Sequence, residues 1–331
     1  MPQAGPLFRA CPRRRRSAVL RYMRVAPVLL VAALPAVCEV VLRQGDASVR
    51  IDIDGRPFTE LFFGPGTAKP YLHPLRSASG KVVTRLYPME RVEGERHDHP
   101  HHQGLWFAHG DVNGFDFWSA TAERKGGKFG RIVLKRLITL ENGTRKGSLA
   151  AEFDWLAPDG AVLLTERRTM VFHSDPALRI IDLDIQLVGV QAVRFGDTKE
   201  GTFAIRVAES MNEARGGRLV SADGRSGEEQ VWGTRAPWMD YCGQVEGETL
   251  GIAIFPHPSS FRHPTYWHVR GYGLFAANVF GRRDFTRDSD ADGSATLEPG
   301  AVWRFRYRVV IHPGDAHAAR LADLYARYAR E

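Results

Sequence analysis

Residues 177–188 carry the sequence ALRIIDLDIQLV, in which apolar and polar side chains alternate from Ile181 to Leu187. Residues 302–311, VWRFRYRVVI, show the same alternation, with arginine at positions 304, 306 and 308. Successive side chains of a β-strand point to opposite faces of the sheet, so both stretches predict strands with one buried and one solvated face. A helix would repeat its apolar residues at every third and fourth position, which neither stretch does.

Turn-forming dipeptides separate stretches of this kind at short intervals. They are Asp54-Gly55, Asn142-Gly143, Asp159-Gly160, Asp175-Pro176, Asp223-Gly224 and Asp292-Gly293. Asn142-Gly143 predicts a hairpin between residues 131–141 and the run around 149–156. Only residues 315–331 show helical spacing, with Ala318, Leu321, Leu324, Tyr325 and Tyr328 on one stripe. The pattern predicts an all-β protein, a large antiparallel β-sandwich with a C-terminal helix.

The chain has 331 residues, of which 44% are apolar and 25% charged. These values are typical of a globular protein and exclude disorder, collagen and coiled coil. Residues 39–331 contain no fixed-period repeat and no Gly/Ser-rich linker, so we expect them to form a single β-sandwich domain.

The formal net charge of +7 comes from the first 38 residues, which hold seven arginines and no acidic residue. Subtracting these seven from the 45 basic residues leaves 38, which balance the 38 acidic residues of the chain. We therefore expect no nucleic acid and no anionic membrane surface as partner of the folded part.

Residues 1–38 have the layout of an export signal: arginines, then an apolar run from Val25 to Val37, then a cysteine. Thirteen apolar residues are too few to span a bilayer, so no membrane-spanning domain is expected. The leader predicts a periplasmic or extracellular protein, by a general secretory or a twin-arginine route. A start at Met23, or a buried strand in place of the signal, is an alternative. Val37 before Cys38 argues against a lipid anchor there. Three cysteines in the chain predict no disulfide framework.

Five of the twelve histidines fall within residues 96–110, RHDHPHHQGLWFAHG. Neutral imidazole is the commonest metal ligand and titrates near neutral pH, so this density points to proton transfer or metal binding. In an extended segment His97, His99 and His101 share one face and His102 points to the other. His99 and His101 are the candidate pair of ligands for a divalent metal ion. The alternative is a polar loop whose imidazoles bind backbone groups.

Two further polar segments accompany this cluster. Residues 255–273, FPHPSSFRHPTYWHVRGYG, contain two His-Pro dipeptides, which predict a rigid, non-helical segment. Residues 195–210, FGDTKEGTFAIRVAES, place Lys199 and Glu200 just before an apolar strand, where they could serve as a hydroxyl clamp and a general base. A solvated turn is the alternative for this pair.

Aromatic residues lie beside these polar segments, and aromatic faces bury the C–H face of a sugar ring while polar groups bind its hydroxyls. They are Trp106, Phe115, Phe117, Trp118, Trp232, Trp238, Tyr241 and Trp267. The combination indicates a carbohydrate ligand, although several of these side chains must belong to the core.

Residues 97–118, HDHPHHQGLWFAHGDVNGFDFW, resemble the PmoA-like domain family, a family of largely unknown activity labelled after methane oxygenase. Residues 197–212, 231–243 and 255–281 are similar to the same family, with Ser259 and Val279 as departures from its pattern. The resemblance implies a sandwich similar to that of aldose epimerases and an association with sugar-catabolic oxidoreductases. A membrane-embedded oxygenase subunit would need several apolar spans of about 20 residues, which the chain lacks after its leader.

The resemblance and the residues together assign the candidate site. The candidate catalytic residues are His101, His102, Glu200, His263 and His268. The candidate substrate-binding residues are Trp106, His109, Lys199, Arg206, His257, Arg262, Trp267 and Arg270.

Our leading hypothesis is an exported enzyme that carries out acid/base chemistry on a sugar, by epimerisation, elimination or glycoside hydrolysis. His101 or His102 would be the general acid and Glu200 the general base, with Trp106 and Trp267 as stacking walls. A non-catalytic glycan-binding module is one alternative. The other is an oxidase or lyase that uses copper, zinc or manganese bound by the histidine cluster.

Overall fold

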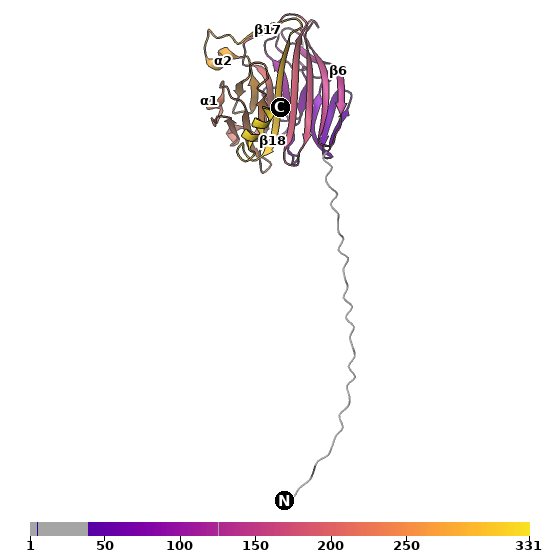
Figure 1. The fold of residues 1–331 in the computed structure, drawn as a ribbon, viewed down its shortest axis with the longest axis vertical. Coiled ribbons are helices and arrows are strands. Elements are labelled where there is room, and N and C mark those ends of the chain that lie inside the picture. Colours follow the sequence, from indigo (N-terminus) through magenta and orange to yellow (C-terminus); the bar gives the residue numbers. More distant parts are fainter. Residues whose placement is uncertain (1–4, 6–38, 125) are drawn as a thin grey trace. The chain divides into compact units, whose positions relative to one another are not determined.

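The computed structural model describes residue 5, residues 39–124 and residues 126–331. The described chain is all-β, as the sequence predicts, and its strands form two eight-stranded antiparallel sheets and one two-stranded sheet. The first sheet has the strand order β1-β2-β3-β4-β5-β11-β16-β15, and the second has the order β12-β13-β14-β18-β9-β8-β7-β6. Strands β10 and β17 pair separately. Figure 1 shows β6 and β18 among the long strands of the second sheet.

The strands of the first sheet are β1 (Val40–Gln44), β2 (Ser48–Ile53), β3 (Arg56–Phe62), β4 (Tyr71–His73), β5 (Leu105–His109), β11 (Gly201–Arg206), β15 (Tyr266–Val269) and β16 (Leu274–Asn278). Those of the second sheet are β6 (Arg131–Glu141), β7 (Lys146–Leu156), β8 (Val162–Ser174), β9 (Arg179–Gly189), β12 (Arg218–Ser221), β13 (Met239–Val245), β14 (Glu248–Pro256) and β18 (Val302–Pro313). The small sheet pairs β10 (Val193–Phe195) with β17 (Ala295–Leu297). The helical elements are η1 (Glu209–Met211), η2 (Glu213–Arg215), α1 (Glu228–Val231), α2 (Arg282–Thr286) and α3 (Leu321–Tyr328).

The two stretches with strict alternation form β9 and β18, which pair with each other in the middle of the second sheet. Every second residue of β9 is buried, as its period predicts. On the opposite face Arg304 of β18 binds Asp184 of β9, and Arg308 binds Asp182. The predicted hairpin at Asn142-Gly143 is also confirmed, because β6 and β7 pair on either side of it.

Aromatic contacts between the two sheets show that the sheets pack face to face. The rings of Phe203 on β11 and Tyr307 on β18 stack with centroids 4.2 Å apart. Phe107 on β5 lies 5.3 Å from Phe305 on β18. The sequence therefore folds as the predicted sandwich, with its apolar core between the sheets.

The C-terminal helix is present but shorter than the predicted segment 315–331. It begins only at Leu321, because Arg320 has left-handed backbone angles, and the turn before it is held by the Asp315 side chain, which accepts a hydrogen bond from the backbone N–H of Ala318. Leu321 and Tyr328 are buried in a small apolar cluster that also contains Phe255 of β14, so the helix covers the outer face of the second sheet.

The predicted export leader, including its apolar run and Cys38, lies outside the described residues, so localisation and the boundary at residue 39 stay predictions. Within the described part of the chain, no helix has the length and apolar character needed to span a membrane. Cys242 is a buried free cysteine.

We predict that Phe203→Ala lowers the free energy of unfolding by about 3–5 kcal/mol, because it removes a fully buried ring between the sheets. Chemical denaturation measures this change. Val302→Ala, on the 53% exposed Val302 side chain of β18, is the control and should change the stability by less than about 0.5 kcal/mol. An equal effect of the two substitutions would contradict the face-to-face packing.

Candidate active site

Side chains from five segments of the chain line one cavity of about 520 Å³, which we call the histidine cavity. They are His99, His101, His102, Ser119, Lys199, Glu200, Glu228, His268, Arg270 and Tyr272. A cavity of this volume lies in the usual range for small-molecule sites. The two histidine-rich segments and the Lys199-Glu200 turn, which are far apart in sequence, thus meet in one place.

The register of the first sheet explains how these segments meet. Neighbouring strands place four residues in one row across β5, β11, β16 and β15: Trp106, Ala204, Ala276 and His268. Phe203, the neighbour of Ala204, points into the core, so this row lies on the outer face of the sheet. Two small alanines between Trp106 and His268 leave room above the sheet for the cavity.

The first histidine segment is a loop and not the extended strand that the sequence analysis assumed. His99 has a positive φ of 43°, and the backbone N–H of His102 donates to the carbonyl of His99 (3.0 Å), which closes a turn. His101 and His102 therefore both line the cavity instead of pointing to opposite faces. Gly104 follows with a φ of 53°, and a Cβ there would lie 2.1 Å from the carbonyl oxygen of Leu72, so only glycine fits at this position.

Two buried arginines hold this loop through one carboxylate. Arg85 and Arg206 bind the same Oδ1 atom of Asp98, at 2.5 Å and 3.0 Å. Arg85 also donates to the carbonyl of His99 (3.0 Å), and Arg206 donates to Nδ1 of His102 (3.3 Å). The contact with Arg206 leaves the proton of neutral His102 on Nε2.

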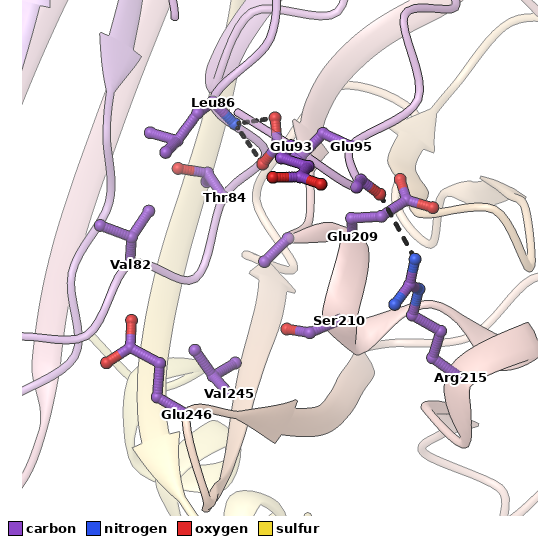
Figure 2. Close-up of a pocket in the computed structure, with 12 residues that line it drawn as sticks. Val82, Thr84, Leu86, Glu93, Glu95, Glu209, Ser210, Arg215, Val245 and Glu246 are labelled. Carbon is purple, nitrogen blue, oxygen red and sulfur yellow. Dashed lines mark hydrogen bonds between the residues drawn. The ribbon is translucent and has the colours of Figure 1, made fainter. Parts of the chain in front are cut away.

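A smaller cavity of about 280 Å³ lies beside the segment that precedes the histidines and carries several carboxylates (Figure 2). The Glu95 carboxylate accepts hydrogen bonds from the backbone N–H of Leu86 (3.0 Å) and Tyr87 (2.8 Å). Glu209 accepts one from the Arg96 side chain (3.0 Å). These carboxylates fix the chain that leads into the histidine loop.

Rings stacked on one another form one wall of the histidine cavity. His102 stacks on Trp106 of the sheet, with centroids 5.2 Å apart, and on His99 at 4.8 Å. His99 in turn stacks on Tyr272 at 5.2 Å. Trp106 is fully buried and supports His102 from below, so it is not the exposed stacking wall that the sequence analysis expected.

Three histidines of the cavity, His101, His102 and His268, are held in the neutral form. Burial lowers the pKa of His101 to about 3, and the nearby charge of Lys69 adds to the effect. Burial, assisted by Arg270, likewise lowers the pKa of His268 to about 3. The pKa of His102 is also well below its usual value, chiefly because of burial. Nδ1 of His101 and Nδ1 of His268 are buried and have no hydrogen-bond partner within the described residues.

Two carboxylates line the cavity in different environments. Burial raises the pKa of Glu200, although Lys199, whose Nζ lies 3.6 Å from Oε1 of Glu200, opposes this shift. Glu228 is engaged on both oxygens, by Arg270 at 2.8 Å and by the backbone N–H of Gly271 at 2.6 Å. Glu200 is therefore the carboxyl group that can exchange a proton with a ligand.

Lys69 is a residue of this region that the sequence analysis missed. Its side chain is fully buried and donates to the carbonyls of Trp118 (2.9 Å) and Ala120 (3.0 Å). It thereby fixes the loop that brings Ser119 to the cavity. Burial lowers the pKa of Lys69 to about 7, while the charge of Asp116 opposes the shift.

Three lining residues were also missed. Ser119 and Glu228 lie in segments with no distinctive spacing, and no signal in the sequence marks them. Tyr272 belongs to the second histidine-rich segment, two positions after Arg270, and the alternation along that segment could have indicated it.

Seven predicted residues do not line the cavity: Trp106 and Arg206 contact His102 from below, and the other five lie elsewhere. Trp267 points into the core, because it is next to the outward-facing His268 on β15, and its Nε1 donates to the carbonyl of Ala236 (3.0 Å). His109 is fully buried, with its Nε2 2.9 Å from the carbonyl of Gly196. His257, Arg262 and His263 lie on the connection between β14 and β15, outside the cavity lining.

Local contacts show where two of these last three residues are held. His257 lies against Arg306 (3.2 Å) and Tyr328 of the C-terminal helix. Arg262 donates to the carbonyl of Ser294 (2.9 Å) and lines a different cavity. Arg206, by contrast, supports the histidine cavity from below through His102, without lining it.

The described residues do not fit the divalent metal ion considered for His99 and His101. No group of three or more His, Cys, Asp or Glu side chains among them is arranged to hold a metal ion. His99 is occupied by stacking and lies 3.3 Å from Asp98, with its ring centroid 5.7 Å from that of His101.

The fold and the cavity define a class: a large antiparallel β-sandwich with a polar, ligand-sized cavity on the outer face of one sheet. Within this class, residues 48–326 match a family of unknown function (DUF6807), and the chain belongs to that family. A search of curated proteins found no match.

Among solved structures, the chain is similar to a galactose mutarotase-like protein from Clostridium acetobutylicum (9% identity, TM-score 0.42, covering 83% of this chain and 98% of that one). It is also similar to a putative aldose 1-epimerase from Klebsiella pneumoniae (10% identity, TM-score 0.40, covering 88% of this chain and 87% of that one). A third similar structure is that of heparan sulfate lyase HepC from Pedobacter heparinus (9% identity, TM-score 0.39, covering 84% of this chain and 36% of that one). At such low TM-scores these similarities carry no argument about ligand or activity, and none concerns a PmoA-like protein.

We predict that His268 makes the stability depend on pH below about 6.5. The unfolded chain binds a proton on this histidine near its ordinary pKa of 6.5, whereas the folded protein does so only near 3. Stability is therefore full above pH 6.5 and falls with decreasing pH, by about 1.4 kcal/mol per pH unit for each such group. His268→Gln should reduce the change of unfolding free energy with pH by about 1.4 kcal/mol per pH unit. Urea unfolding between pH 6.5 and 4.5 measures this change.

The matched control is His317→Gln, at an exposed histidine before α3, which should keep the slope of the unsubstituted protein. If His268→Gln and His317→Gln gave the same slope, a neutral buried His268 would be ruled out.

Proposed function

We propose that this protein is a carbohydrate-active enzyme that carries out acid/base chemistry in the histidine cavity. The observation that carries the proposal is the opposite tuning of two kinds of group in one cavity. The pKa of Glu200 is raised, and the pKa values of His101, His102 and His268 are lowered. Groups whose environments separate their pKa values in this way are characteristic of acid/base sites.

The tuning changes the roles that the sequence analysis gave to the histidines. An imidazole with a pKa of about 3 carries no proton to donate as a cationic acid at neutral pH. In the proposed mechanism neutral His101 and His268 bind ligand oxygens, and Glu200 moves the proton. Its raised pKa brings it closer to the pH at which a carboxyl group both accepts and releases protons efficiently.

A polyhydroxylated ligand suits the lining better than a charged or apolar one. The two cations, Lys199 and Arg270, each lie beside a carboxylate, so the lining carries little net charge. Ser119 and the neutral imidazoles of His101 and His268 in the lining add neutral polar groups. Tyr272 supplies an aromatic ring at the wall, which can pack against the C–H face of a sugar.

Proton transfer at a sugar carbon, as in epimerisation or elimination, suits the site better than glycoside hydrolysis. Most glycosidases need two carboxyl groups that act on the same bond. Here Glu228 is held on both oxygens by Arg270 and Gly271, which leaves Glu200 as the one available carboxyl group of the cavity. A neutral imidazole could stabilise the enolate that forms when a proton leaves a carbon next to a carbonyl.

The test is exchange of carbon-bound protons in D₂O, followed by ¹H NMR over a panel of aldoses, keto-sugars and uronates. We predict that the protein exchanges a proton of at least one sugar, and that Glu200→Gln lowers this rate by about 10²–10⁴-fold, the usual share of one proton-transfer group. Glu248→Gln, on β14 in the other sheet, is the control and should keep the full rate.

Undiminished exchange by Glu200→Gln would reject the assigned proton-transfer residue. Saturable sugar binding without exchange or product, unchanged by Glu200→Gln, would reject the enzyme and support a glycan-binding module.

The proposal includes action outside the cytoplasm, on the basis of the predicted leader. We predict that the mature protein starts near residue 39, because the small residues before this point form the expected cleavage zone. Amino-terminal sequencing of the protein recovered from the periplasm or the medium tests this. An intact leader on protein confined to the cytoplasm would contradict it.

A further inference from the structure

A second ligand-sized cavity, which we call the arginine cavity, lies beside α2. Its volume is about 590 Å³, and it is lined by Arg235, Arg262, Tyr266, Val279, Arg282, Thr286, Asp292 and Gly293. Phe285 of α2 lies 5.3 Å from the ring of Tyr266 in this cavity and 6.1 Å from that of His268 in the other. One side chain of α2 is therefore close to a residue of each cavity.

Two of the three arginines are held in place before any ligand binds. Arg235 lies over the ring of Tyr266 (5.1 Å), and its Nε donates to the carbonyl of Pro264 (2.8 Å). Arg262 lies over the ring of Phe280 (5.5 Å), and its Nη2 donates to the carbonyl of Ser294 (2.9 Å). Guanidinium groups fixed in this way lose little conformational entropy when they bind a ligand.

The charge of the arginine cavity is unbalanced. Three guanidinium groups face one carboxylate in the lining, and that carboxylate, Asp292, already accepts hydrogen bonds from the backbone N–H (2.8 Å) and the hydroxyl (3.0 Å) of Ser294. Asp197 is the other acid near Arg262, and its Oδ2 accepts from the backbone N–H of Arg283 (3.0 Å) and Gly293 (2.7 Å).

Arg282 is the least engaged of the three arginines. It is exposed and donates no hydrogen bond to any residue of the described chain. Residues 39–331 as a whole have equal numbers of acidic and basic residues, so the excess of positive charge belongs to this place and not to the protein in general.

We propose that the arginine cavity binds an oxyanionic group, a carboxylate or a sulfate, of an acidic saccharide. Planar guanidinium groups bind such groups through paired, charge-assisted hydrogen bonds. Tyr266 offers an aromatic ring beside the cations for the sugar ring that carries the anion. The saccharide part of the proposal rests on the function proposed above, whereas the oxyanion part rests on the arginine cavity alone.

The experiment is an NMR titration of the full chain, followed on the arginine Nε–Hε signals, with sodium sulfate, sodium D-glucuronate and D-glucose as separate probes. We expect saturable shifts of Arg235 and Arg262 with sulfate and glucuronate, and none with glucose. Arg282→Gln should lower the affinity for both anions about tenfold, which corresponds to the loss of one charge-assisted hydrogen bond. High salt should also lower the affinity for both anions, because it screens the charges.

Arg287→Gln is the matched control, because Arg287 is an exposed arginine five positions further on that does not line the cavity. It should bind both anions as the unsubstituted protein does. Equal weakening by both substitutions, or no saturable shift with either anion, would overturn the proposal. Binding of sulfate without glucuronate would overturn the saccharide part.

Glu200→Gln separates this proposal from the function proposed for the histidine cavity. It should leave anion binding at the arginine cavity unchanged. If the protein exchanged no sugar proton but still bound both anions in an Arg282-dependent way, the enzyme proposal would fail and the arginine cavity would stand.

Discussion

The alternation of side chains along the strands of the first sheet is the constraint on which both the core and the candidate site depend. On β11, Phe203 points inward and stacks on Tyr307 of the second sheet, while Ala204 points outward below the histidine cavity. On β15, Trp267 points inward and His268 outward. Because each strand serves the core on one face and the cavity on the other, a shift of register by one residue would destroy both at once.

Burial of positive charge next to the histidines is the second organising feature. Arg85 and Arg206 are fully buried and share one carboxylate, and Lys69 is buried near His101. Protonating His101 or His102 would add a charge to a region that is already cationic and poorly solvated, so these two imidazoles stay neutral. The stacked column from Trp106 to Tyr272 keeps His102 and His99 in fixed orientations. The histidine cavity is therefore organised to bind with imidazoles, not to donate protons from them.

The fold class was predictable because period-two alternation and turn dipeptides are local signals, and both sheets follow from them. Residues of both histidine segments were assigned to one candidate site from the sequence, but no spacing in the chain showed that the two segments meet. The identity of the residues that line the cavity was not predictable, because it depends on the register of strands far apart in the chain. Trp267 illustrates the point: one position separates it from His268, and only the pairing of β15 with β16 decides which of them faces outward. The conformation of the histidine loop was missed because it depends on a left-handed residue, His99, and on arginines distant in sequence.

The turn that carries Lys199 and Glu200 is tied to α2 by two reciprocal interactions. The Asp284 side chain of α2 accepts a hydrogen bond from the backbone N–H of Lys199 (3.0 Å), and Asp197 at the start of the turn accepts one from the backbone N–H of Arg283 in α2 (3.0 Å). The same helix begins with Arg282 of the arginine cavity. A ligand that reached from the histidine cavity to the arginine cavity would thus contact two parts of the chain that are already tied to each other, and binding at one end would position the other end without reordering the chain. Such preorganisation costs less entropy than closing a flexible loop over each cavity separately.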